Sequence, residues 1–185
     1  MRKAAMLALA LWLTGAGAMA GQEGGAPSCE LKRAEKGGVV TLDAGVWTAE
    51  CREGAGCVLR GPEVAGHRLQ LSHPLKAQHW QVVLSLPEPA DAAEGVALVV
   101  DDGEPMRVPY EFLNVRAGGR ALAIRPEVVN VVLEALRAGR RLEWRYTRKG
   151  GAARATSFDM ACLPALLKAA DAQLAQMRAM RQLGK

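Results

Sequence analysis

Aromatic residues are scarce in this 185-residue sequence, which contains four Trp, two Tyr and two Phe. A strong charge of one sign is also lacking, because 24 Lys and Arg are set against 19 Asp and Glu. This mild excess, without the aromatic strand pattern of RNA-binding modules, argues against a nucleic-acid partner. Half of the residues are hydrophobic, which excludes a disordered or collagen-like chain. Past residue 20 no apolar run is long enough to span a bilayer.

The sequence also lacks a catalytic motif. No serine lies in a Gly-x-Ser-x-Gly elbow, and the acidic residues Glu88, Asp91 and Glu94 lie in a Pro/Ala-rich loop where charge is usually only solvated. His67, His73 and His79 are six residues apart, about 20 Å on an extended strand, which is too far for neighbours to share an ion unless the chain folds back. We therefore expect a non-enzymatic protein without a metal or cofactor, with an envelope hydrolase as the less favoured alternative.

The N-terminus has the pattern of a secretory signal peptide. Arg2 and Lys3 precede an apolar run over residues 4–14, and the small residues Ala18 and Ala20 mark a cleavage site. The run is about half the ~20 residues of a membrane-spanning helix, which disfavours an uncleaved anchor. We predict a signal peptide over residues 1–20, a flexible Gly/Ala/Pro-rich leader over residues 21–28 and a single domain over residues 29–185. The mature chain is then periplasmic or secreted.

Four cysteines agree with export to an oxidising compartment. Four thiols allow three pairings, but Cys51 and Cys57 flank Gly54 and Gly56, which favour a tight turn and a local bridge. This leaves Cys29 to pair with Cys162, which ties the start of the domain to its last helix. The spacings lack the paired short gaps of zinc ligands, and four free thiols remain the alternative.

Short β-rich runs separated by Gly, Pro and Asp predict a mainly β domain, an antiparallel sandwich with two helices. Strands are expected at residues 39–42, 46–49, 57–60, 68–72, 80–86, 96–100, 106–110, 120–124, 141–147 and 152–158. In the run 80–86, Trp80, Val82 and Leu84 share the apolar face and Val83 lies on the polar side. The Asp-Gly pair within residues 101–105 predicts a hairpin turn, because glycine tolerates positive φ.

Two segments have helical periodicity. The first, over residues 126–138, begins at Pro126, ends before Gly139 and places Val129, Leu133 and Leu136 on one face. The second is expected from about Leu163 to Leu183. Its end past Met177 either frays or binds a partner or a membrane surface.

One stretch of the chain is rich in basic residues, and it forms a candidate interaction surface. Guanidinium groups bind phosphate and carboxylate well, so an anionic envelope polymer or an acidic protein is the expected partner. The alternative is a solvated strand face next to a turn. The residues are Arg137, Arg140, Arg141, Arg145, Arg148 and Lys149.

Several segments resemble the invasion-associated locus B family of exported bacterial proteins over about residues 46–172. They are Val46 to Cys51, Gly56 to Leu59, Gly95 to Gly103, Val108 to Tyr110, Leu142 to Tyr146 and Ser157-Phe158. A related exported envelope family of unknown function has a similar Trp-x-x-x-Cys opening. The chain departs from the family pattern at Phe112 to Gly119, which lacks a cysteine pair, and at Cys162.

The resemblance implies a periplasmic or secreted, mainly β, non-enzymatic accessory protein of a Gram-negative bacterium, associated with virulence, host invasion or envelope maintenance. It supplies no catalytic residues. Together these observations predict an exported, disulfide-stabilised interaction protein whose partner is an envelope or host protein or an anionic polymer. A periplasmic carrier of a small ligand is the alternative.

Overall fold

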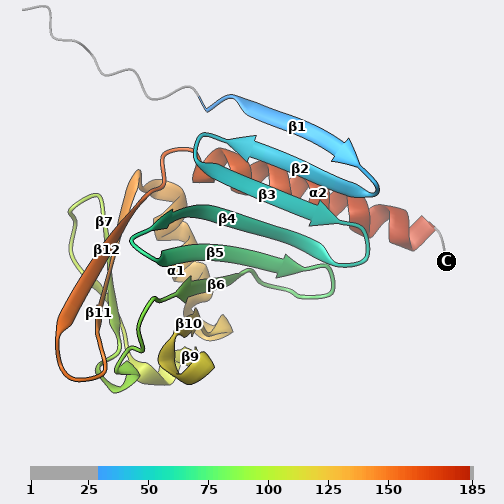
Figure 1. Ribbon diagram of the computed structural model, residues 1–185. Coiled ribbons are helices and arrows are strands. Elements are labelled where there is room, and N and C mark those ends of the chain that lie inside the picture. Colours follow the sequence, from blue (N-terminus) through green and yellow to red (C-terminus); the bar gives the residue numbers. More distant parts are fainter. Residues whose placement is uncertain (1–28, 184–185) are drawn as a thin grey trace, which may run out of the picture.

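A computed structural model describes residues 29–183 of the chain as two antiparallel sheets and two long helices (Figure 1). The mainly β, single-domain architecture with helices over residues 126–138 and at the C-terminus confirms the predicted fold class. The predicted signal peptide (1–20) and leader (21–28) lie outside the described residues, as do residues 184–185. None of the helices within residues 29–183 is long and apolar enough to cross a membrane.

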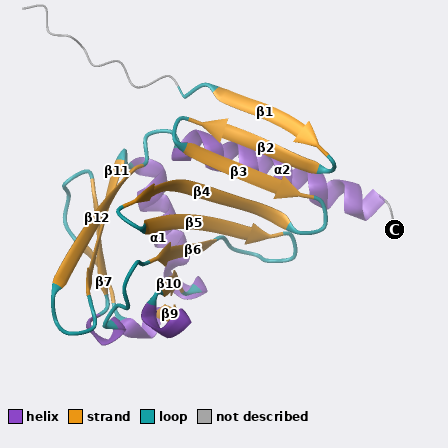
Figure 2. Ribbon diagram, in the orientation of Figure 1, coloured by secondary structure: helices purple, strands orange, loops and turns teal. Residues whose placement is uncertain are grey.

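The large sheet has eight strands in the order β1-β2-β3-β4-β5-β6-β10-β9. Its first six strands follow one another as a meander of antiparallel pairs (Figure 2). The strands are β1 (Leu31–Lys36), β2 (Val39–Ala44), β3 (Trp47–Arg52), β4 (Gly56–Val64), β5 (His67–Pro74), β6 (Gln81–Ser85), β9 (Leu113–Arg116) and β10 (Ala121–Ile124).

The small sheet has four strands in the order β12-β11-β7-β8. It consists of β7 (Val96–Val100), β8 (Met106–Val108), β11 (Arg141–Thr147) and β12 (Ala153–Asp159). Short 3-10 turns occupy η1 (Ala92–Glu94), η2 (Tyr110–Phe112) and η3 (Ala117–Gly119). Two strands, β1 and β9, were not expected from the sequence, and the strand expected at residues 106–110 ends at Val108 before η2.

The helices α1 (Pro126–Ala138) and α2 (Leu163–Leu183) have the predicted bounds. Helix α2 packs against β2, β3 and β4 on the inner face of the large sheet, and α1 packs against α2 and β6. The small sheet covers the remaining part of the core. In the view of Figure 1, α2 lies behind the large sheet.

The core forms between the two sheets and the helices from the alternating apolar residues of each strand. Trp47 and Trp144 are fully buried, and Trp80, Val82, Leu84 and Leu86 are all buried while Val83 is only partly buried, as predicted. The Nε1 atom of Trp47 donates a hydrogen bond to the carbonyl oxygen of Asp159 (2.7 Å), so β3 and β12 are held together at the edge where the two sheets meet.

The predicted hairpin turn between β7 and β8 is present, but the glycine is not its left-handed residue. Asp101 and Asp102 have positive φ (49° and 60°), and the N–H of Gly103 donates to the carbonyl oxygen of Val100. Aspartate tolerates this conformation better than most residues. The Asp101 carboxylate accepts hydrogen bonds from the backbone N–H groups of Arg140 and Arg141, both at 2.8 Å, and so fixes the link from α1 to β11.

Candidate functional site: the outer face of the small sheet

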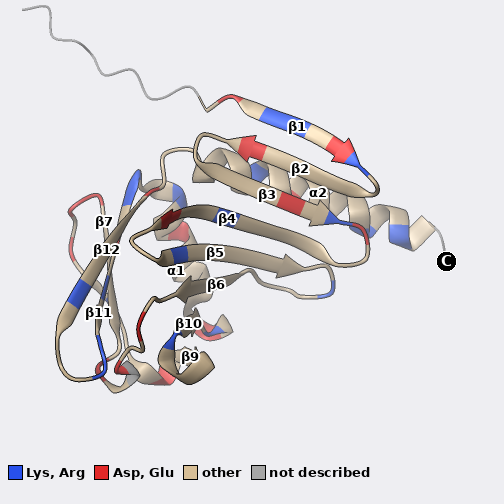
Figure 3. Ribbon diagram, viewed as in Figure 1, with Lys and Arg blue, Asp and Glu red and all other residues tan. Residues whose placement is uncertain are grey.

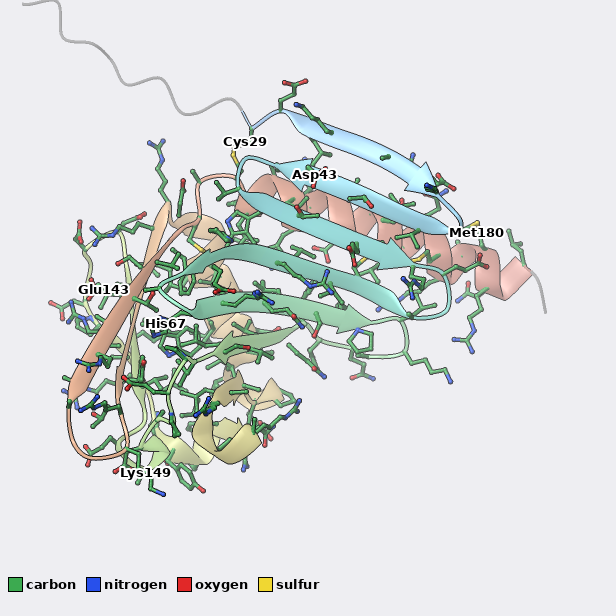
Figure 4. The ribbon with its side chains drawn as sticks, viewed as in Figure 1. Cys29, Asp43, His67, Glu143, Lys149 and Met180 are labelled. Atoms are coloured by element: carbon green, nitrogen blue, oxygen red, sulfur yellow. A yellow bond between two sulfur atoms is a disulfide. The ribbon has the colours of Figure 1, made fainter. Side chains whose placement is uncertain are left out.

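Both disulfides pair as the sequence predicted. Cys51 and Cys57 lie directly opposite each other on β3 and β4, with Cα atoms 4.0 Å apart. Cys29 joins Cys162 across 133 residues and anchors β1 to the start of α2 (Figure 4). This second bridge matters locally because all six residues of β1 are exposed and none contributes to the core. Two disulfides fit an exported protein.

A polar seam lies where the two sheets meet. His67 at the start of β5 is buried, and its Nε2 atom lies 2.9 Å from the hydroxyl of Tyr146 on β11. The Nδ1 atom lies 3.1 Å from the carbonyl oxygens of Val64 and Ala65, so Nδ1 carries the proton and Nε2 accepts from the tyrosine. Burial, with the nearby Glu88 carboxylate, raises the pKa of Tyr146.

Glu88 continues this seam toward solvent. Its carboxylate accepts hydrogen bonds from Arg154 (3.0 Å) and Arg148 (3.3 Å). The hydrogen bond from Arg154 is the main cause that lowers the pKa of Glu88, against a smaller opposing effect of burial. The Glu88 carboxylate therefore neutralises part of the positive charge of Arg148 and Arg154.

The six basic residues predicted as one surface lie on several elements. Arg137 on α1 faces α2 and forms an ion pair with Asp171 (3.3 Å). Arg148 forms the ion pair with Glu88 described above. Arg140, before β11, and Lys149, in the β11–β12 turn, are the two residues of the six that form no ion pair within residues 29–183. Figure 4 shows Lys149 at the tip of the small sheet, away from His67.

Arg141 and Arg145 are the two residues of the stretch that share one face. They point outward from β11 together with Glu143, while the alternate residues Leu142, Trp144 and Tyr146 are buried. Glu143 forms ion pairs with both arginines, and Arg141 also contacts Asp102 (3.5 Å). In Figure 3, acidic and basic segments are likewise mixed over the ribbon. The predicted stretch thus carries much less unbalanced charge than its sequence indicates.

The outer face of the small sheet is hollowed into a groove of about 670 Å³, which we call the small-sheet groove. The strand register explains the hollow, because Ala155, Arg145, Ala97 and Arg107 are successive neighbours across β12, β11, β7 and β8. Small alanines alternate with long arginines along this row. The arginine side chains therefore form the walls of the groove, and the alanines form its floor. The lining also includes Tyr110, Glu94 and Glu111, and Tyr110 is 54% exposed.

Arg145 is the residue of the predicted basic stretch that helps to line this groove; Arg107 and Tyr110 were not singled out from the sequence. Their position follows from the pairing of β8 with β7 and of β7 with β11, and the second pairing joins segments more than 40 residues apart. A single sequence carries no local signal for that pairing. Tyr110 was noted only as part of the Val-Pro-Tyr segment of the family resemblance.

The histidines lie in ordinary strand or loop environments. His73 on β5 is buried with its ring edge-on to Trp80, at a centroid distance of 5.2 Å. Within residues 29–183 no group of three or more His, Cys, Asp or Glu side chains is placed to hold a metal ion.

Comparison with solved structures finds a protein with a similar fold. The chain is similar to the crystal structure of invasion associated protein B from Bartonella henselae, with 19% sequence identity and a TM-score of 0.51. The match covers 72% of this chain and 96% of that one, and it shows a shared fold. No family model matches the sequence, and no curated protein matches it.

Proposed function

We propose that this chain is an exported, non-enzymatic interaction protein of the bacterial envelope, which binds a macromolecular partner through the small-sheet groove. The observation that carries the proposal is the groove itself, because it runs open across four strands and presents charges of both signs beside an exposed tyrosine. Tyrosine and arginine are enriched where proteins bind one another.

The disulfides and the fold support the exported location. Structural disulfides persist in the periplasm and outside the cell and are rare in the bacterial cytosol. The structural neighbour is described as invasion associated. From this similarity of fold we propose a role at the envelope or in host interaction. The similarity gives no reason to assign a catalytic activity.

The groove also favours a protein partner over an anionic polymer at this face. The positive and negative charges of the groove are equal in number. Its lining contains Arg107, Arg145 and Arg154, and the acidic residues are Glu94 and Glu111 in the lining and Glu143 at its border. A purely anionic polymer gains little from a surface of balanced charge, whereas a polypeptide offers both signs together with apolar side chains. We therefore propose an envelope or host protein as the partner of the groove.

Affinity capture from crosslinked native envelopes tests the proposal. The bait is the oxidised protein, and the variant Arg107→Glu with Arg145→Glu reverses both arginines that flank Ala97. A matched control, Arg60→Glu with Arg68→Glu, makes the same charge change at two exposed arginines on the large sheet. We expect the partner to be retained by the wild type and the control and lost by the groove variant. Loss of the partner with the control alone, or equal capture by all three baits, contradicts the proposal.

The volume of the groove also favours a second candidate, a periplasmic carrier of a small ligand, because about 670 Å³ is within the range of small-molecule sites. Native mass spectrometry of the purified protein distinguishes the two. A bound small molecule that is lost with Arg107→Glu and Arg145→Glu supports the carrier, and a ligand-free protein that still captures its partner supports the interaction protein.

A further inference from the structure

A second cluster of arginines lies at the far edge of the large sheet. Strands β9 and β10 form a hairpin that carries Arg116, Arg120 and, one residue past β10, Arg125. We call this unit the arginine hairpin. All three side chains are exposed, and none makes a hydrogen bond or an ion pair within residues 29–183. From Phe112 to Pro126 the sequence contains no acidic residue.

The strand register gathers the three arginines on one hairpin. Arg116 is paired with Ala121, and the turn of Ala117 to Gly119 brings Arg120 beside that pair. Arg125 is four residues beyond Ala121, about 13 Å along an extended chain, and its backbone N–H still bonds across to Phe112. By the alternation of an extended chain, Arg125, Ala123 and Ala121 share the face opposite to Leu122 and Ile124; on that face Ala123 is buried, Ala121 is partly exposed and Arg125 is exposed.

This cluster differs electrostatically from the basic stretch predicted from the sequence. In that stretch four of the six basic side chains are ion-paired. In the arginine hairpin none of the three side chains forms an ion pair within residues 29–183, and the nearest acidic residues along the chain are Glu111 and Glu127, at either end of the segment. Ion pairs formed inside a protein reduce the field that an outside anion meets, so the three arginines of the hairpin are available to an anion, whereas only Arg140 and Lys149 of the basic stretch are without an ion pair in the described part of the chain.

The edge position and an apolar neighbour indicate a flat partner. Strand β9 is the last strand of the large sheet. When a flat partner approaches this edge of the sheet, side chains from both faces of β9 can contact it. Val115, which precedes Arg116 and points to the opposite face, is 37% exposed. Cations beside an exposed aliphatic side chain suit the headgroup region of a bilayer, where arginine binds phosphate and the aliphatic group reaches toward the acyl chains.

We infer that the arginine hairpin is a docking surface for the anionic phospholipid headgroups of a membrane, separate from the small-sheet groove. Arg116, Arg120 and Arg125 bind lipid phosphates, and Val115 adds a small apolar contact. The contact holds the protein at a membrane surface without a membrane-spanning segment. The interaction is electrostatic in origin, so it weakens as the salt concentration rises.

Vesicle co-sedimentation of the oxidised protein tests this inference. The probes are vesicles of phosphatidylglycerol with phosphatidylcholine, and vesicles of phosphatidylcholine alone, at low and at physiological salt. The variant Arg116→Gln, Arg120→Gln, Arg125→Gln removes three charges from the hairpin. The matched control Arg60→Gln, Arg68→Gln, Arg137→Gln removes three charges from ion-paired arginines outside the small-sheet groove. A third variant, Arg116→Lys, Arg120→Lys, Arg125→Lys, keeps the charge.

We expect wild-type protein to bind the anionic vesicles and not the neutral ones, with affinity reduced at least about tenfold by the hairpin variant. The control and the lysine protein are expected to stay within about threefold of wild type. Equal loss in the hairpin variant and the control overturns the inference, as does binding of wild type to neutral vesicles. Binding to soluble inorganic polyphosphate without binding to anionic vesicles also overturns it, because the partner is then a soluble polyanion. None of these outcomes depends on the partner of the small-sheet groove.

Discussion

The Nε2 atom of His67 lies 2.9 Å from the hydroxyl oxygen of Tyr146, and this hydrogen bond joins β5 of the large sheet to β11 of the small sheet. Both side chains are buried. The contact fixes the small sheet against the large one near the C-terminal end of β11, and the neighbouring Arg145, on the opposite face of the strand, lines the small-sheet groove. The hydrogen bond between His67 and Tyr146 therefore holds β11 in place on the side of the small sheet opposite to the proposed binding face.

Substitution of Tyr146 by Phe removes the hydroxyl and leaves the shape of the ring. The buried Nε2 of His67 then lacks its hydrogen-bond donor, and we expect the free energy of unfolding to fall by about 1–3 kcal/mol. Urea unfolding measures the change. The matched control is Tyr110→Phe at the exposed tyrosine, with an expected effect within about 0.5 kcal/mol. Equal effects of the two substitutions contradict the role of the seam.

The ion pairs of Glu88 predict that the stability of the protein depends on pH in the acid range. Because the folded state lowers the pKa of Glu88, its ionised form is stabilising, and the contribution is present above the ordinary value of 4.5 and lost as the pH falls through the lowered pKa of the folded protein. We expect wild type to melt above Glu88→Gln at neutral pH, and the gap to close in acid below pH 4.5. Thermal unfolding of both proteins across the pH range checks this, and a gap independent of pH contradicts it.

Asp101 gives a test of the link between α1 and β11. Asp101→Ala removes the acceptor for two backbone N–H groups, and we expect a cost of about 1–2 kcal/mol beyond that of Asp102→Ala. Both substitutions bear a similar penalty for alanine at positive φ, so the difference isolates the carboxylate. The Asp102 side chain is 84% exposed and makes a single long ion pair with Arg141. A cost for Asp102→Ala as large as that for Asp101→Ala would count against the assignment.

The two disulfides are expected to differ in their contribution to stability. On the loop-entropy model, removing Cys29–Cys162 costs roughly 5 kcal/mol and removing Cys51–Cys57 roughly 2 kcal/mol, because the first closes a loop of 133 residues and the second one of six. Denaturant unfolding of the two double alanine variants measures this order. The reverse order, with the local bridge more important, is the result that the model does not allow.

Local patterns made much of the fold predictable from the sequence. The helix over Pro126–Ala138 follows from its proline start, its glycine stop and its apolar period. The face of β6 follows from strict alternation, since Trp80, Val82 and Leu84 are buried. The disulfide pairing follows from the tight turn between Cys51 and Cys57, which decides the second pair by elimination.

Features that depend on distant pairing were not predictable in the same way. Strand β1 is a charged segment with all residues exposed, so it has no alternation, and its strand form comes from pairing with β2. The small-sheet groove exists because Ala97 lies between Arg145 and Arg107 in the register of three strands. The ion pairs that neutralise the basic stretch likewise bring in Glu88 and Asp171 from other elements.

The most direct test of the proposed function is site-specific photo-crosslinking in the native envelope. A photoreactive residue at Ala155, inside the small-sheet groove, is compared with one at Gln81, on the outer face of the large sheet. The account predicts a reproducible covalent partner protein from position 155, none from position 81, and its loss when Arg107 and Arg145 are reversed to Glu. The same partner captured from both positions, or uncrosslinked monomer from both, contradicts it.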